Sequence, residues 1–189
     1  MKIIVTTNKL KNAGLNRRST MKYLLIISTL ITGLFAQGES QTGWIYEQST
    51  FQSFYMLQDL TIDGQTAEGD GSGAWGGNGN CPGDNGCDVV GAFIDRDGQE
   101  VCVGWTYADA SENVTTIPLM GNDGSNTTSL YLLNGEVPSL KIYDSSNGSI
   151  LDVIPAEALG GFQNNEIYFI YGTSTANNTF GCTDGSACG

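Results

Sequence analysis

Short runs of β-favouring residues, each closed by a cluster of Gly, Asn, Asp or Ser, fill the chain between residues 43 and 171. This pattern is typical of strands joined by tight turns. Helix signals are nearly absent, because only Pro155–Leu159 could form a turn or two. The expected strands are Gly43–Glu47, Phe51–Leu57, Asp59–Ile62, Val89–Ile94, Glu100–Thr106, Thr115–Met120, Leu130–Leu133, Leu140–Tyr143, Ile150–Ile154 and Glu166–Tyr171. About ten short strands at this spacing predict an all-β fold, an antiparallel two-sheet β-sandwich whose topology, jelly-roll-like or Ig-like, stays open.

Two of the turns carry specific hairpin signals. Asp95–Gly98 links two valine-rich runs, and Ser145–Gly148 separates two later runs. Asp, Asn and Gly tolerate the left-handed backbone conformations that tight hairpins require. In one run Val101, Val103 and Trp105 alternate with smaller residues, so we predict that these three side chains share one buried face.

Charge is divided sharply along the chain. Six of the eight Lys and Arg residues lie in the first 22 positions, whereas all 20 Asp and Glu residues lie from Glu39 onward. The chain after residue 36 therefore carries only Arg96 and Lys141 against 20 acids, a formal charge of −18. Such a surface repels phosphate backbones, so no nucleic acid partner is expected. It attracts divalent cations or basic surfaces.

The basic N-terminal part contains a targeting segment. Met21 and Lys22 precede the apolar run Tyr23–Phe35, which is followed by Ala36. A basic start, an apolar run of this length and a small residue at its end are typical of a secretory signal peptide. The run is shorter than the roughly 20 residues of a membrane span. We expect cleavage after Ala36, or after Gly38, and a mature chain that is secreted or on the cell surface and not in the membrane.

These features predict a chain of four parts. Residues 1–20 precede a self-sufficient signal, either as a mis-assigned start or as a long n-region. The parts are 1–20 (upstream extension), 21–36 (signal peptide), 37–173 (β-sandwich domain with a Gly-rich insertion at 64–87) and 174–189 (linker and the beginning of a cysteine motif).

The segment Gly64–Gly86 is the main irregularity of the predicted domain. Roughly 20 residues without periodicity are uncommon inside a compact domain and tend to be functional or disordered. Trp75 lies among glycines, where no core face is expected, so we predict that it contacts a ligand or partner. The alternative is a mobile insertion without a role.

Five cysteines in an exported chain predict disulfide bonds. Cys81 and Cys87 bracket a short Pro-Gly-Asp-Asn-Gly segment and form the first expected pair; Cys182 and Cys188 form the second. Cys102, between two valines, is left over and is expected to be a buried thiol that packs as a small hydrophobe. A zinc site is the alternative, but the chain has no His and no CxxC to support it.

Turns rich in side-chain oxygen make Ca²⁺ the candidate cofactor. Asp95, Asp97 and Glu100 resemble the opening of a calcium-binding loop, although the closing glutamate of an EF-hand is missing. Asp88 and Asp123 are further candidate ligands, one at the head of a strand and one in a Gly-flanked turn. The competing interpretation is that Asp and Asn bind their own backbone to make turns.

Catalysis and carbohydrate binding depend on different residues. The absence of His excludes the Ser-His-Asp and Cys-His arrangements. Two carboxylates suffice for a glycosidase, but no acid lies in a signature motif, and we expect no enzyme. Trp44, Trp75, Trp105 and Tyr107 carry flat faces that can stack on sugars; Trp75 and Tyr107 are the expected contacts, and Trp105 is expected in the core.

Several separate motifs carry a family resemblance. They are Tyr46–Thr50, Ser53–Tyr55, Asp88–Phe93, Val101–Gly104, Ile117–Gly124, Gly135–Asp144 and Asn164–Ile167. In this order they resemble an uncharacterised secreted β module that is common in large surface proteins of marine bacteria. The Gly-rich stretch 69–87 departs from that pattern, which usually has a short turn there. The resemblance implies an exported, modular protein and brings no known activity.

The end of the chain resembles the start of a second module. Gly181-Cys-Thr-Asp and Ala187-Cys188 resemble a Cys-rich repeat of the Gly-Cys-Thr-Asp type, which normally supplies a third Cys. The resemblance implies a longer parent protein and, for Cys182 or Cys188, a partner outside this chain.

These patterns together predict an extracellular, non-catalytic structural or adhesion module of a larger cell-surface or secreted protein, with calcium as its candidate stabiliser. Its expected partners are other domains or surface proteins. The alternative function is a carbohydrate-binding module, with glycans as partners, attached to a partner domain that this chain lacks.

Overall fold

The computed structural model describes residues 36–73 and 86–175. All its regular elements in this range are strands, which confirms the all-β prediction. The strands are β1 (Ala36–Gly38), β2 (Ile45–Glu47), β3 (Gln52–Gln58), β4 (Thr61–Ile62), β5 (Gln65–Thr66), β6 (Val89–Arg96), β7 (Gln99–Tyr107), β8 (Val114–Met120), β9 (Ser139–Asp144), β10 (Ser149–Ile154), β11 (Ile167–Ile170) and β12 (Ser174–Thr175). Within this part of the chain, no helix is long and apolar enough to cross a membrane.

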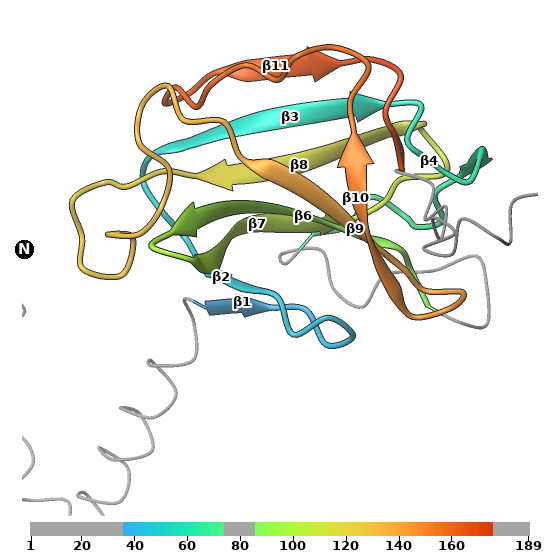
Figure 1. The fold of residues 1–189 in the computed structure, drawn as a ribbon, viewed down its shortest axis with the longest axis horizontal. Coiled ribbons are helices and arrows are strands. Elements are labelled where there is room, and N and C mark those ends of the chain that lie inside the picture. The colour runs from blue at the N-terminus through green and yellow to red at the C-terminus, as the bar shows by residue number, and fades with distance from the viewer. Residues whose placement is uncertain (1–35, 74–85, 176–189) are drawn as a thin grey trace, which may run out of the picture. The chain divides into compact units, whose positions relative to one another are not determined.

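The strands form two packed sheets and a small ribbon. The larger sheet has seven strands in the order β5-β4-β12-β10-β9-β6-β7, the smaller has the order β11-β3-β8, and β1 pairs with β2. Figure 1 shows β11, β3 and β8 side by side, with β7 and β6 next to them. The predicted β-sandwich is therefore confirmed. Pairing is antiparallel except between β11 and β3 and between β12 and β4, which run parallel.

Alternation along β3 determines which side of the smaller sheet faces the core. Ser53, Tyr55 and Leu57 are buried, whereas the residues between them are half-buried and point outward. Tyr55 and Leu57 lie opposite Ile117 and Thr115 of β8, which are buried as well. The core joins this face to side chains of the larger sheet, including Val90, Ala92, Leu140 and Ile142. A period of two, readable in the sequence, thus fixes the inner face of β3.

A β-bulge in β7 overturns the prediction that Val101, Val103 and Trp105 share one face. The register with β6 steps from Ala92↔Gly104 to Phe93↔Cys102, so Val103 is an extra residue on β7. An extra residue moves the side chains beyond it to the opposite face. Val101 and Trp105 therefore lie on opposite faces of β7. Trp105 is buried, as predicted.

The β1–β2 ribbon and its turn pack against the side of the β6–β7 hairpin on which Trp105 lies. The indole of Trp44 packs edge-on against the Phe93 ring at 5.0 Å between centroids, and the Tyr107 hydroxyl donates a hydrogen bond to Glu39 Oε1 at 3.2 Å. Trp105 packs edge-on against Tyr107 at 5.5 Å. The second face of the β6–β7 hairpin is thereby closed to solvent.

Two predicted elements are wrong. Leu130–Leu133 forms a turn with a single bridge at Leu132 instead of a strand, because Arg96 binds the backbone carbonyls of Leu130 and Tyr131. Pro155–Leu159 contains bends and no helical turn. Gly160 and Gly161, which follow it, supply carbonyl oxygens to the hydroxyls of Tyr55 and Tyr168 instead.

Part of the predicted insertion is fixed to the domain. Gly71 N donates to Ala108 O at 2.8 Å, and Tyr107 N donates to Ser72 O at 2.9 Å. Residues 70–73 thus run antiparallel to the end of β7 and the residues after it, whereas residues 65–66 form β5 and pair with β4. The predicted signal peptide, the upstream extension, the end of the chain from residue 176, Trp75 and Cys81 lie outside the described residues and stay predictions.

Gly104 is the position where the two sheets approach most closely along β7 and β8. A Cβ at this position would lie 1.8 Å from the Pro118 carbonyl oxygen. We predict that Gly104→Ala lowers the free energy of unfolding by about 1–3 kcal/mol or more, because backbone must move to admit the methyl group. Urea unfolding measures the change. The matched control is Gly73→Ala, whose Cβ would meet only Thr106 Oγ1 at 3.5 Å; equal losses in both variants would contradict the prediction.

Candidate functional site

The predicted calcium ligands lie at separate places in the fold. Asp95, Asp97 and Glu100 belong to the β6–β7 hairpin, whereas Asp88 stands just before β6 at its other end. Because β6 has eight residues, the two ends are about 26 Å apart. Asp123 follows β8 in a third location. The five acids therefore do not form one site.

The hairpin acids are used by the turn itself. Register pairs Arg96 with Gln99, so the turn has two residues, Asp97 at φ 55° and Gly98 at φ 81°. Positive φ at both positions is the geometry of a tight hairpin turn. Asp95 Oδ1 accepts a hydrogen bond from Gly98 N at 3.0 Å. The predicted hairpin is confirmed, and Asp95 makes the backbone contact of the turn.

Glu100 is paired with a cation of the chain. Its Oε1 lies 2.6 Å from Lys141 Nζ on β9, and the ammonium also lies over the Phe93 ring at 5.5 Å from its centroid. Lys141 is one of only two basic residues after residue 36. Glu100 thus helps to fix the edge of the larger sheet.

Asp88 joins three segments. It is buried at 4% exposure, and its carboxylate accepts hydrogen bonds from Glu68 N at 2.7 Å and from both N and Oγ of Ser145 at 2.9 Å. Its carbonyl oxygen accepts a further bond from Ala108 N. Both carboxylate oxygens are therefore engaged in holding the strand ends together.

Asp123 closes the loop after β8. Its Oδ2 accepts bonds from N and Oγ1 of Thr50 at 2.9 Å, and its Oδ1 accepts from Thr128 Oγ1 at 2.6 Å and Ser125 N at 3.1 Å. Across residues 36–73 and 86–175, no three acidic or cysteine side chains gather to hold a metal ion. Calcium binding stays a prediction.

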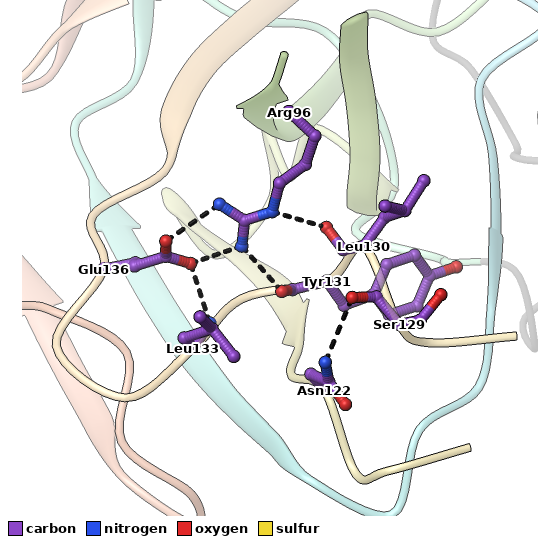
Figure 2. Close-up of polar contacts among 7 residues, drawn as sticks. All are labelled: Arg96, Asn122, Ser129, Leu130, Tyr131, Leu133 and Glu136. Carbon is purple, nitrogen blue, oxygen red and sulfur yellow. Dashed lines mark hydrogen bonds and ion pairs between the residues drawn. The ribbon is translucent and has the colours of Figure 1, made fainter. Parts of the chain in front are cut away.

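Arg96 is the centre of the best-connected polar cluster. Its guanidinium binds both carboxylate oxygens of Glu136 and the carbonyl oxygens of Leu130 and Tyr131, as Figure 2 shows. Glu136 also accepts a bond from Leu133 N at 2.8 Å. This planar, forked contact, which a lysine cannot reproduce, fixes the segment after β8 against the β6–β7 hairpin.

Two cysteines fall within the described residues. Cys102 is a free thiol, as predicted, and burial raises its pKa to about 12. The thiolate, which is the reactive form, is therefore disfavoured at neutral pH for this half-buried residue. Cys87 is fully buried and disulfide-bonded. The pairings Cys81–Cys87 and Cys182–Cys188 stay predictions.

The most developed binding geometry is a hollow of about 420 Å³ over the seam where β7 meets β8. Its lining includes Gln52 and Phe54 of β3, Trp105 of β7, Pro118 of β8, and the residues Gly71 and Gly73. This volume lies in the range of ligand pockets, roughly 300–1,000 Å³. We call it the seam hollow.

Of the aromatic residues considered as sugar contacts, Trp105 lines the seam hollow and Tyr107 does not. Gly73, two residues before Trp75, also lines the hollow. Tyr107 is 8% exposed and lies under the β1–β2 ribbon, bonded to Glu39. The sequence did not identify Gln48 and Gln52 as lining residues. Gln52 lies on the predicted strand Phe51–Leu57 and Gln48 precedes it, and nothing else in the sequence distinguished them.

A second hollow, of about 340 Å³, is acidic. Asp63, Glu68, Asp88 and Asp144 line it beside the β9–β10 turn. Asp144 accepts bonds from Ser146 N and Oγ and from Asn147 Nδ2. Its buried carboxylates therefore serve the turn, and the hollow attracts cations only through its net field.

No protein-family model matches the chain, and no curated protein and no solved structure is significantly similar to it.

Among the residues that the structure describes, four carboxyl groups have a pKa below the ordinary value. Burial raises the pKa of Glu39, but hydrogen bonds from Gln41, Thr42 and Tyr107 outweigh it. The same competition lowers the pKa of Asp109. Hydrogen bonds from the Thr128 hydroxyl and then from Thr50 and Ser125 lower the pKa of Asp123, and Arg96 lowers that of Glu136.

We predict that acid destabilises the fold through these groups. A carboxyl whose pKa is lower in the folded chain stabilises it above the unfolded pKa of about 4, and the stabilisation is lost as pH falls through the folded value. The melting temperature should be steady from about pH 7 to 5 and fall below about pH 4. Calorimetry on Glu39→Gln provides the control: its deficit relative to wild type should shrink as pH falls. A deficit that is constant with pH would contradict this account.

We predict that cations stabilise the domain by general screening of the −18 charge that the chain carries after residue 36. CaCl₂ and NaCl at equal ionic strength should then raise the melting temperature by similar amounts, and a chelator should have no effect. Differential scanning fluorimetry checks this. A rise at micromolar Ca²⁺ that Asp97→Ala abolishes would instead establish the calcium site expected at the hairpin.

Proposed function

We propose that this chain is an exported, non-catalytic structural or adhesion module of a larger cell-surface or secreted protein. The observation that carries the proposal is an apolar surface on an otherwise acidic domain. Ile167, Phe169 and Tyr171 are 52%, 56% and 52% exposed at the outer edge of the smaller sheet. In the β11–β3 register, Phe54 lies beside Ile167 and Met56 beside Phe169.

Grouped apolar side chains on a surface mark sites of contact with other molecules. β11 also has no charged residue and forms an edge of its sheet in Figure 1. An uncharged edge strand is open to pairing with a further strand. Contact through this face fits a module that works beside other domains, which is also what the family resemblance implies.

The use of the acids supports a function without catalysis. Asp88, Asp123 and Asp144 direct their carboxylate oxygens at backbone amides and hydroxyls of neighbouring turns. A glycosidase needs one carboxylic acid and one carboxylate on either side of an open site. None of the described residues that line the seam hollow is acidic, so its lining does not contain such a pair.

A second candidate function is carbohydrate binding. It is favoured by the seam hollow, which combines aromatic surface with amide and hydroxyl groups. The predicted contact Trp75 would belong to the same function.

The test of the main proposal follows the chain in cells that produce it naturally. We expect the processed chain outside the cytoplasm and retained at the cell surface, and we expect Ile167→Ser combined with Phe169→Ser to release most of it into the medium. Immunoblots of cytoplasm, surface and medium measure the distribution.

The matched control changes Ile150 and Ile154 to Ser, because both lie on β10 and are about as exposed, at 50% and 52%. Release of both double variants to the same extent would reject the apolar face as the contact surface. Retention of the wild-type chain in the cytoplasm would reject the proposal altogether.

A further inference from the structure

The seam hollow is electrically neutral although the chain around it is not. None of its described lining residues carries a charge, whereas the chain after residue 36 has a formal charge of −18. An anionic ligand would meet the repulsion of the whole domain without a cationic partner in the hollow. A cationic ligand would find no carboxylate there. The chemistry of the lining therefore selects an uncharged ligand.

Two amide side chains give the hollow a hydrogen-bonding edge. Gln48 Nε2 donates to Gln52 Oε1 at 3.3 Å, which orients the two amides relative to each other. Within the described residues, Gln52 Nε2 and Gln48 Oε1 have no hydrogen-bond partner, and neither is a buried unsatisfied atom. Gln52 Nε2 is thus a donor, and Gln48 Oε1 an acceptor, that is left for the hydroxyl groups of a ligand.

Apolar groups supply the surface against which the ligand would lie. Phe54 and Pro118 are opposite each other in the β3–β8 register, and both are half-buried on the outer face of the sheet. Trp105 adds an aromatic edge from β7. Pockets of this type bind through apolar walls and gain orientation from a few polar groups.

We infer that the seam hollow is a binding site for an uncharged saccharide, held by its hydroxyl groups at Gln48 and Gln52 and by its C–H faces at Phe54 and Pro118. This inference rests on the second proposed function, carbohydrate binding, and assigns it a place and a ligand class. A sugar presents both hydroxyl groups and apolar ring faces, and its neutrality matches the uncharged lining.

Isothermal titration calorimetry on the exported chain tests the inference. The probes are a soluble neutral β-glucan, a neutral mannan, a uronic-acid polysaccharide and a proline-rich peptide. We expect one of the neutral glycans to bind with an affinity that does not change between low and high salt. Gln52→Leu should weaken that binding at least tenfold. The control is Gln58→Leu, which lies on the same face of β3 at its other end and should bind as wild type does.

The possible results distinguish a failure of the assigned site from a failure of carbohydrate binding itself. Neutral glycan binding that is unaffected by Gln52→Leu would overturn the assigned site and leave carbohydrate binding in place. Binding of the uronic-acid polysaccharide alone would overturn the ligand class. Binding of the proline-rich peptide alone, or of no probe, would overturn both the inference and the second function. Thermal unfolding of each variant ensures that a loss of binding is not a loss of fold.

Discussion

The fold depends on how two cations, Arg96 and Lys141, are used in a chain that has 20 acids after residue 36. Arg96 binds Glu136 and two backbone carbonyls, and Lys141 binds Glu100, so each cation ties separate segments together. Like charges in excess destabilise a compact state. The remaining acids therefore need other partners, and several find them in backbone amides and hydroxyl groups. Glu39, for example, closes the turn between β1 and β2 through Gln41 and Thr42.

This use of carboxylates explains why the acidic sequence forms turns where a metal was expected. A carboxylate can accept several hydrogen bonds, and turns expose backbone amides that need acceptors. Asp88 and Asp144 occupy such turns at the same end of the larger sheet. Sequence alone cannot separate this role from metal binding, because both require oxygen-rich turns. The distance between the turns, which depends on the tertiary fold, is not readable from the sequence either.

Local signals in the sequence predicted local structure well. The Asp95–Gly98 and Ser145–Gly148 hairpins follow from the preferences of Asp, Asn and Gly for tight turns. The bulge at Val103 was missed because it arises from the fit of β7 against its neighbours. The seam hollow was missed for a related reason: Gln52 and Trp105 meet only because the edges of two sheets adjoin. The residue pattern of one strand does not indicate which residues of another sheet lie beside it.

The pairing of β11 with β3 determines when the smaller sheet can form during synthesis of the chain. β11 comes late in the chain and pairs with β3, which comes early. Just before β11, the side chain of Asn164 accepts a hydrogen bond from Gln52 N, 112 residues earlier in the chain. Loops of this length close slowly, and the contacts they enable form late. The smaller sheet is therefore incomplete until nearly the whole domain has been synthesised. In the export that we propose, this delay would leave the chain unfolded while it crosses the membrane.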